Sequence, residues 1–150
     1  MKAGFSQRDI TPPLGTRMFG WGSRDDEHGC TDIHDRLDVR ALWISHDDED
    51  AIIFGFDLLF FDRAIADRIR GAIGRRFDLA PRQILLNTSH THNGPTTGTW
   101  WTAGNSAPDD LYLDFLERTV IDCAVEAKSA RVDVKAGAGS TAVDFAVSRR

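Results

Sequence analysis

Alternating hydrophobic and polar residues predict two paired strands in the first third of the chain. Residues 38–45 alternate as a half-buried strand does, and residues 51–58 are apolar on both sides, as in the middle of a sheet. The acidic residues 46–50 between them form a turn, so a hairpin is expected. A further short strand is predicted at residues 3–10. The inward side of the first hairpin strand carries Val39, Ala41 and Trp43.

Two longer segments have a helical period. Apolar residues recur every three or four positions in residues 61–77 and from about Asp109 to Ala130, which predicts two amphipathic helices. Cys123 lies on the apolar stripe of the second helix, which favours a core thiol over a nucleophile. Strand, helix and strand follow one another in residues 51–88, a parallel crossover unit. The fold class is therefore α/β, with a mixed sheet and flanking helices.

The end of the chain predicts a last hairpin. Val132 and Val134 precede a glycine-containing turn at residues 137–139, and residues 143–147 alternate again. This strand-like pattern continues to the last residues without a turn or cap. We therefore expect residues 1–150 to be a single domain or a fragment.

Composition excludes some classes of function. The 150 residues carry a formal net charge of -5, which argues against a nucleic-acid partner, because such binding needs a basic face. No apolar stretch approaches the roughly 20 residues of a transmembrane segment. The N-terminus lacks the apolar core of a signal peptide, which predicts a cytoplasmic protein unless the N-terminus has been trimmed. Two cysteines are too few for a disulfide framework.

The strongest chemical signal is a pair of histidines one residue apart. An apolar run at residues 84–86 leads to His90 and His92, and a Gly94-Pro95 turn stops the run. If the strand continued through the motif, both imidazoles would point to the same side. Two imidazoles are half of a typical zinc site, although a half-exposed polar strand end has the same pattern. A third ligand must come from elsewhere, and the sequence does not name it.

Several short motifs follow one another along the chain, at residues 3–5, 9–15, 33–37, 40–42, Asp57, 89–95, the helix beginning near Tyr112, and 148–150. Together, and in the same order, they resemble the N-terminal part of the neutral/alkaline non-lysosomal ceramidase family. The resemblance spans essentially the whole chain and implies that residues 1–150 are the N-terminal portion of a larger catalytic domain. It also implies a zinc-dependent hydrolase of linear amides, which converts an N-acyl sphingoid lipid or a related small N-acyl amine to a fatty acid and an amine.

The resemblance also implies roles for three residues. His90 matches a zinc ligand, and His92 matches a substrate-side histidine near the scissile carbonyl. Arg149 matches the substrate-side arginine of an Asn-Arg motif, in which Ser148 here replaces the asparagine. The family's remaining zinc ligands (a second His, a Glu and a Tyr) and its catalytic Ser lie in sequence that this chain does not contain. The resemblance therefore implies a weak or incomplete zinc site.

Other interpretations of the same features stay open. The chain could be a non-catalytic domain with a structural or ligand-binding histidine loop, or a metallohydrolase acting on another substrate. Asp57 could orient a histidine or cap the next turn. His34 and Asp35 could line a pocket or form a surface pair, and Trp100 and Trp101 could bind an acyl chain or cover the sheet.

Overall fold

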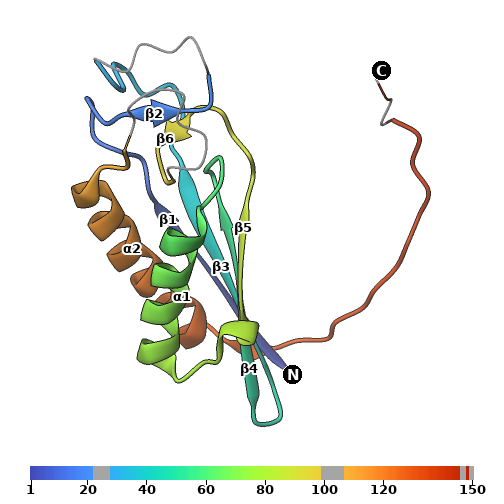
Figure 1. Ribbon diagram of the computed structural model, residues 1–150. Helices are drawn as coiled ribbons and strands as arrows, with labels where there is room; N and C mark the ends of the chain where they lie inside the picture. The colour runs from blue at the N-terminus through green and yellow to red at the C-terminus, as the bar shows by residue number, and fades with distance from the viewer. Residues whose placement is uncertain (22–27, 99–106, 146–147, 149–150) are drawn as a thin grey trace.

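The computed structural model describes residues 1–21, 28–98, 107–145 and 148 of the chain. Its body is a five-stranded sheet in the order β5-β4-β3-β1-β7, with a separate two-stranded sheet at one end (Figure 1). The strands of the main sheet are β1 (Lys2–Asp9), β3 (Asp38–His46), β4 (Glu49–Phe56), β5 (Ile84–Thr88) and β7 (Val132–Asp133). The small sheet pairs β2 (Met18–Phe19) with β6 (Gly94–Pro95).

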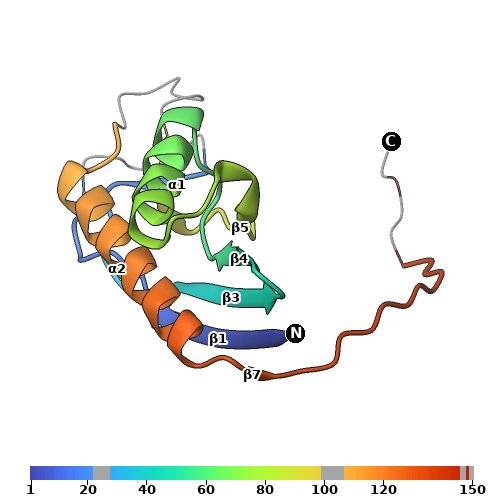
Figure 2. The same cartoon turned by 90° about the horizontal axis from the view of Figure 1, so that it is seen from below.

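The predicted α/β class with a mixed sheet is confirmed. Strands β1, β3 and β4 are antiparallel neighbours, whereas β5 lies parallel to β4. The crossover between β4 and β5 contains helix α1 (Arg63–Phe77) and a short 3-10 turn at Pro81–Gln83, as the strand-helix-strand pattern predicts. Helix α1 and helix α2 (Asp110–Ser129) lie on the same face of the sheet (Figure 2).

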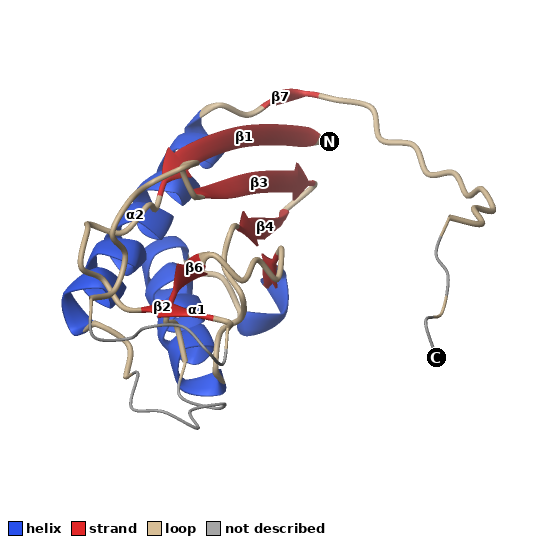
Figure 3. Cartoon of the chain, turned by 90° about the horizontal axis from the view of Figure 1, so that it is seen from above, coloured by secondary structure: helices blue, strands red, loops and turns tan. Residues whose placement is uncertain are grey.

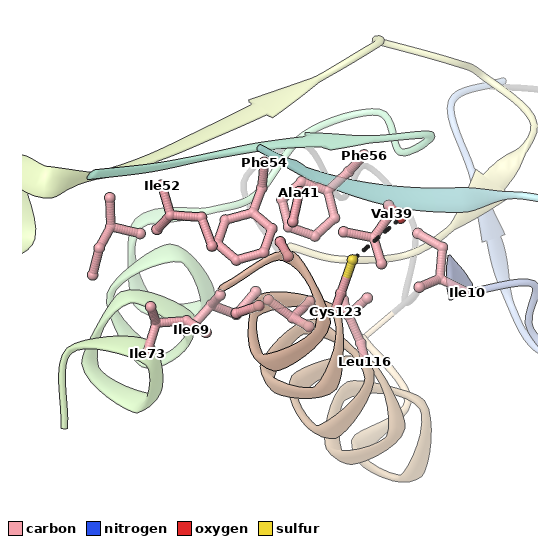
Figure 4. Packing of buried hydrophobic residues seen from close by; sticks show 14 of the residues in the cluster. Ile10, Val39, Ala41, Ile52, Phe54, Phe56, Ile69, Ile73, Leu116 and Cys123 are labelled. Carbon is pink, nitrogen blue, oxygen red and sulfur yellow. Dashed lines mark hydrogen bonds between the residues drawn. The ribbon is translucent and has the colours of Figure 1, made fainter. Parts of the chain in front are cut away.

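The hairpin of β3 and β4 forms as expected. His46 pairs with Glu49, which leaves Asp47 and Asp48 in a tight turn where Asp47 adopts a left-handed φ of 49°. The alternation of β3 is also confirmed, because its inward side chains are completely buried under the helices. Figure 4 shows this core between the sheet and the two helices. Its largest buried members on the two strands are Trp43, Phe54, Phe56 and Ile52.

Each helix begins at an aspartate that caps its free backbone amides. The Asp62 carboxylate accepts a hydrogen bond from the Ile65 amide, and Asp109 accepts bonds from the Leu111 and Tyr112 amides. The predicted boundaries are therefore correct to within about two residues. The described helices include none that is long and apolar enough to cross a membrane.

The interpretation of Cys123 as a core thiol is also confirmed. Its sulfur is fully buried and lies 3.0 Å from the Ser6 hydroxyl, at the contact between α2 and β1. Burial raises the pKa of this thiol, so it stays protonated and is a poor nucleophile.

The predicted last hairpin is wrong. Residues Val132 and Asp133 form a two-residue strand that pairs with Ala3 and Lys2 of β1, not with a later segment. Between residues 134 and 145, which are all described, the chain has no strand, and Figure 1 shows it running away from the body. The side chains of Val143 and Phe145 are 64% and 82% exposed. Their alternating pattern suits a strand, but within the described residues no neighbouring strand edge pairs with it.

Candidate functional site

The histidine motif lies where the main sheet meets the small sheet. Strand β5 ends at Thr88, two residues before His90. The chain then stays beside the exit of β4, because the amides of Ser89 and His90 donate to the carbonyls of Phe56 and Leu58. His90 adopts a left-handed φ of 63°. The expectation that strand alternation aligns the two histidines is therefore wrong, since neither residue belongs to the strand.

The two imidazoles nevertheless lie together. Their ring centroids are 5.2 Å apart, and the ring planes meet at 72°. His90 is exposed and His92 is half-buried, so the pair is open to solvent on one side. The sequence predicted that the two imidazoles are neighbours because a strand would continue through the motif. They are neighbours, but because the loop bends at His90.

Backbone carbonyls fix the orientation of both rings. Nδ1 of His90 lies 3.1 Å from the Leu59 carbonyl oxygen, and Nδ1 of His92 lies 2.6 Å from the Gly20 carbonyl oxygen. A carbonyl oxygen only accepts hydrogen bonds, so Nδ1 must carry the proton in both rings. In the neutral imidazoles the lone pair is then on Nε2. This arrangement, in which a carbonyl holds one nitrogen, is the one that metal-ligating histidines commonly use.

The small sheet brings a distant segment against His92. Strand β2 pairs with β6, just beyond the histidine loop (Figure 3). Gly20 and Trp21 directly follow β2 and lie beside the His92 ring. The Trp21 and His92 ring centroids are 5.4 Å apart in an edge-to-face contact. Sequence reasoning assigned neither residue to the site. No local pattern could have done so, because the contact joins residues 72 positions apart.

A cavity of about 750 Å³ lies behind the histidine loop. Thr91 and Asn93 line it, but His90 and His92 are not among its lining residues. Its other wall comes from the long loop after β1 and includes His28, His34 and Asp35. The two faces of the histidine loop therefore differ: alternate residues face the cavity, and the imidazoles face Leu59 and Gly20.

The remaining candidate residues have other roles or lie elsewhere. Asp57 does not orient a histidine, since its carboxylate accepts from the Asp38 amide and from Arg40 at the start of β3. His34 and Asp35 form both predicted features, a surface pair with Nδ1 2.7 Å from the carboxylate and part of the cavity wall. The hydrogen bond to Asp35 raises the pKa of His34. Arg149, Trp100 and Trp101 lie outside the described residues.

The donors present fit part of a zinc site. Two neighbouring imidazoles with Nδ1 held by backbone carbonyls suit zinc, which takes three or four protein ligands. Within the part of the chain that the structure describes, no group of three or more His, Cys, Asp or Glu side chains is placed to hold a metal ion. Any further ligands would have to come from residues that the structure does not describe or from another segment.

Comparison with known proteins gives a structural likeness. No protein-family profile matches the chain, and no curated sequence does. Among solved structures, the neutral ceramidase from Pseudomonas aeruginosa is similar with a TM-score of 0.75 and 17% identity over 87% of this chain. A ceramidase complexed with C2 is similar with a TM-score of 0.71 and 18% identity, again over 87% of this chain.

The likeness confirms the fold and the resemblance seen in the sequence motifs. The match covers only 22% and 21% of those two solved chains, so this chain spans about a fifth of their length. At such low identity the likeness concerns the fold. It shows that these residues fold as one part of a ceramidase does.

Proposed function

We propose that this chain carries part of the active site of a ceramidase-like, zinc-dependent hydrolase of linear amides. His90 is the zinc ligand that the chain supplies, and His92 faces the scissile amide. The substrate class is an N-acyl sphingoid lipid or a related N-acyl amine. The observation that carries the proposal is the histidine pair, whose two Nδ1 atoms are both held by backbone carbonyls.

The geometry supports different roles for the two rings. His90 is the more exposed ring, and its Nδ1 bond to Leu59 leaves Nε2 as the metal-binding nitrogen. His92 is the more enclosed ring, fixed between the Gly20 carbonyl and the Trp21 side chain. A fixed ring beside a metal ligand suits a group that acts on the substrate.

The chemistry follows from the tautomer. A bound zinc ion would polarise the amide carbonyl and lower the pKa of a bound water toward about 7. His92, neutral and with its lone pair on Nε2, accepts the proton that the attacking water loses. The protonated ring then donates that proton to the leaving amine nitrogen, while Gly20 continues to hold Nδ1.

The surroundings of the pair suit an apolar substrate with a polar amide. Trp21 is 58% exposed next to His92, which gives the apolar part of a lipid a surface to lie against. We assign substrate binding to Arg149 as well, on the sequence resemblance alone. A guanidinium donates hydrogen bonds to carbonyl or hydroxyl oxygens of such a substrate.

Metal analysis tests the assignment of His90. Protein purified from the complete gene without chelator should contain about one zinc per chain, as the one-metal site requires. His90→Ala should lose the zinc and stay folded, whereas His46→Ala, on the exposed β3–β4 turn, should keep it. Stoichiometric zinc in the His90→Ala protein would remove His90 from the ligand set.

A second measurement separates the roles. His92→Ala should keep the zinc and lose about 100- to 10,000-fold in hydrolysis of a fluorescent N-acyl amine, the usual contribution of a general acid–base group. Loss of zinc instead would make His92 a metal ligand. Residues 1–150 alone should show no metal-dependent turnover, because the described residues place no group of three or more His, Cys, Asp or Glu side chains where they could hold a metal ion together. Turnover equal to that of the complete gene product would show that the site is complete within these residues.

A non-catalytic role is the second candidate, and the cavity favours it. Thr91, Asn93 and the His34–Asp35 pair line a cavity of about 750 Å³ that the two imidazoles do not face. The histidine loop could thus form the wall of a small-ligand site without any hydrolysis. A protein that never binds zinc at stoichiometric levels would favour this alternative.

A further inference from the structure

We propose that the Gly20–Trp21 segment is a positioning element for His92, which fixes both the tautomer and the orientation of the imidazole. The role it serves rests on the proposed function, but the positioning itself does not. The segment contacts the ring through the hydrogen bond from Nδ1 to the Gly20 carbonyl, 2.6 Å long, and through the edge-to-face contact with Trp21.

Glycine is required at position 20 for two reasons. Its φ of 119° lies in a region that L side chains rarely adopt. A Cβ at this position would also lie 2.9 Å from the His92 Cα, 3.0 Å from its Cβ and 3.1 Å from its Cγ. All three atoms belong to His92, so any larger residue at position 20 must push this histidine away. The close approach of the two backbones is what allows the short hydrogen bond.

The hydrogen bond decides where the ring proton resides. A neutral histidine side chain in water favours the proton on Nε2, whereas the Gly20 carbonyl holds it on Nδ1. With the proton held on Nδ1, the lone pair of the neutral ring is on Nε2. His92 can then accept a proton from the substrate side.

The Trp21 contact restricts the ring in a second direction. The ring planes of Trp21 and His92 meet at 61°, so the indole lies against the imidazole and limits its rotation about the side-chain bonds. Pairing of β2 with β6 anchors the segment immediately before Gly20, since Phe19 pairs with Gly94. The Gly20–Trp21 segment is therefore anchored through β6, which follows the histidine loop, and not through β5, which precedes it.

Nitrogen NMR of the histidine rings tests the proposal in the 150-residue chain. The chain has five histidines, and a His92→Asn variant identifies the signal of His92. At a pH where the ring is neutral, the wild-type spectrum should show Nδ1 of His92 protonated. Gly20→Ala should shift the ring toward the Nε2-protonated form. An unchanged His92 spectrum in Gly20→Ala would overturn the positioning role.

Gly15→Ala is the matched control. Gly15 also has a positive φ, 86°, but a Cβ there would meet nothing within 4 Å. Both variants therefore carry similar backbone strain, and only Gly20→Ala disturbs His92. The His92 signal should stay in the wild-type position in Gly15→Ala. An equal shift in both variants would show a general loss of structure and would contradict a specific role of Gly20.

Trp21 variants and activity complete the test. Trp21→Ala should broaden the His92 ring signals through added motion, and Trp21→Phe should restore them. In the complete gene product, Gly20→Ala should lower kcat by about 100-fold or more, as expected for a misplaced reacting group, with zinc retained. If the NMR result holds but no hydrolysis is found in the wild type, the positioning stands and the proposed function fails.

Discussion

The two faces of the main sheet carry similar apolar residues but differ completely in their cover. On the helix side, Trp43 and Phe54 are fully buried. On the other side, Phe5 and Leu85 are 57% and 54% exposed, and Leu42 and Ile53 are each 37% exposed. No described helix covers that second face (Figure 2). Strand alternation thus decides which residues share a face, but it does not decide whether anything covers that face.

The uncovered residues form one continuous row. Phe5 pairs with Leu42, Leu42 with Ile53, and Ile53 with Leu85, so four apolar side chains lie in line across four strands. We call this set the open-face row. A row of this kind is more than the scattered exposed apolar residues that any surface has. The contrast with the helix-covered face can be tested by matched substitutions.

Two phenylalanines give the sharpest comparison. Phe54→Ala should lower the free energy of unfolding by about 3–5 kcal/mol, because it empties a fully buried site. Phe5→Ala, on the open-face row, should lower it by about 1 kcal/mol or less, the range of strand propensity. Urea unfolding of both variants measures the difference. Equal losses would mean that the open face is covered in solution.

Two glycines in the strands, Gly4 on the helix-covered face and Gly55 on the open face, allow the same comparison between the two faces. A Cβ on Gly4 would lie 2.0 Å from the Ala127 carbonyl oxygen, so Gly4→Ala must push α2 away and should cost about 1–3 kcal/mol. A Cβ on Gly55 meets nothing within 4 Å, so Gly55→Ala should leave stability equal or raise it by about 0.4–1 kcal/mol. Thermal unfolding compares the two. A destabilised Gly55→Ala protein would contradict an open face.

Acid should weaken the helix-covered side through Asp50. Burial alone would raise the pKa of its carboxyl, but the hydrogen bond from the Ser45 hydroxyl and the charges of Lys128 and Arg131 outweigh burial and hold the pKa below its ordinary 3.8. As the pH falls, the Asp50 carboxyl is therefore protonated at a higher pH in the unfolded chain than in the folded protein. The stabilisation is intact above pH 3.8 and is lost as the pH falls through the lower folded value.

Asp50→Asn tests this pH dependence. The variant should lose about 1 kcal/mol or less at neutral pH, and its stability should fall less steeply than the wild type's below about pH 4. Asp47→Asn is the control, since its side chain on the β3–β4 turn is 87% exposed. Unfolding measured across the acid range distinguishes them. Parallel acid curves for wild type and Asp50→Asn would exclude this carboxyl as the cause.

The smallest expected effect on stability is at the edge of the open-face row. Leu85→Lys should change the free energy of unfolding by about 0.5 kcal/mol or less, as for most surface substitutions. It should nevertheless reduce binding of a fluorescent hydrophobic dye and concentration-dependent self-association, because it interrupts the row. Leu111→Lys, at a site 79% exposed on α2, should leave both readings unchanged. If Leu85→Lys and Leu111→Lys changed dye binding and self-association equally, the open-face row would not be the surface responsible for them.

Most of the fold follows from local periodicity, because each helix and each strand of the β3–β4 hairpin carries its own pattern. Capping aspartates at residues 62 and 109 fix the helix starts in the same local way. Val143 and Phe145 show the limit of the method, since alternation indicates a strand but does not supply its partner. A strand without a neighbour leaves its backbone groups to water and gains little.

The site was predictable only in part. The motif identified His90 and His92 correctly as neighbours, but a strand was the wrong reason, because the chain bends at His90. Gly20 and Trp21 reach the site through tertiary contacts made by a two-residue strand, and such short pairings leave no periodic signal. For Asp57 the sequence left two roles open, orienting a histidine or capping the next turn, whereas its carboxylate accepts from the Asp38 amide and from Arg40.

The placement of β1 also determines how quickly the chain can fold. Although β1 is the first strand in the sequence, it lies between β3 and β7, so Lys2 pairs with both Ser45 and Asp133. The hairpin of β3 and β4 can form early through its short turn. Strand β1, in contrast, must pair with residues that lie far from it in the sequence, about 130 positions away for β7. Closing such long loops costs entropy before any contact repays it, which slows the search for the native state. We therefore expect refolding over roughly milliseconds to seconds, with pairing of β1 and β7 as a late step.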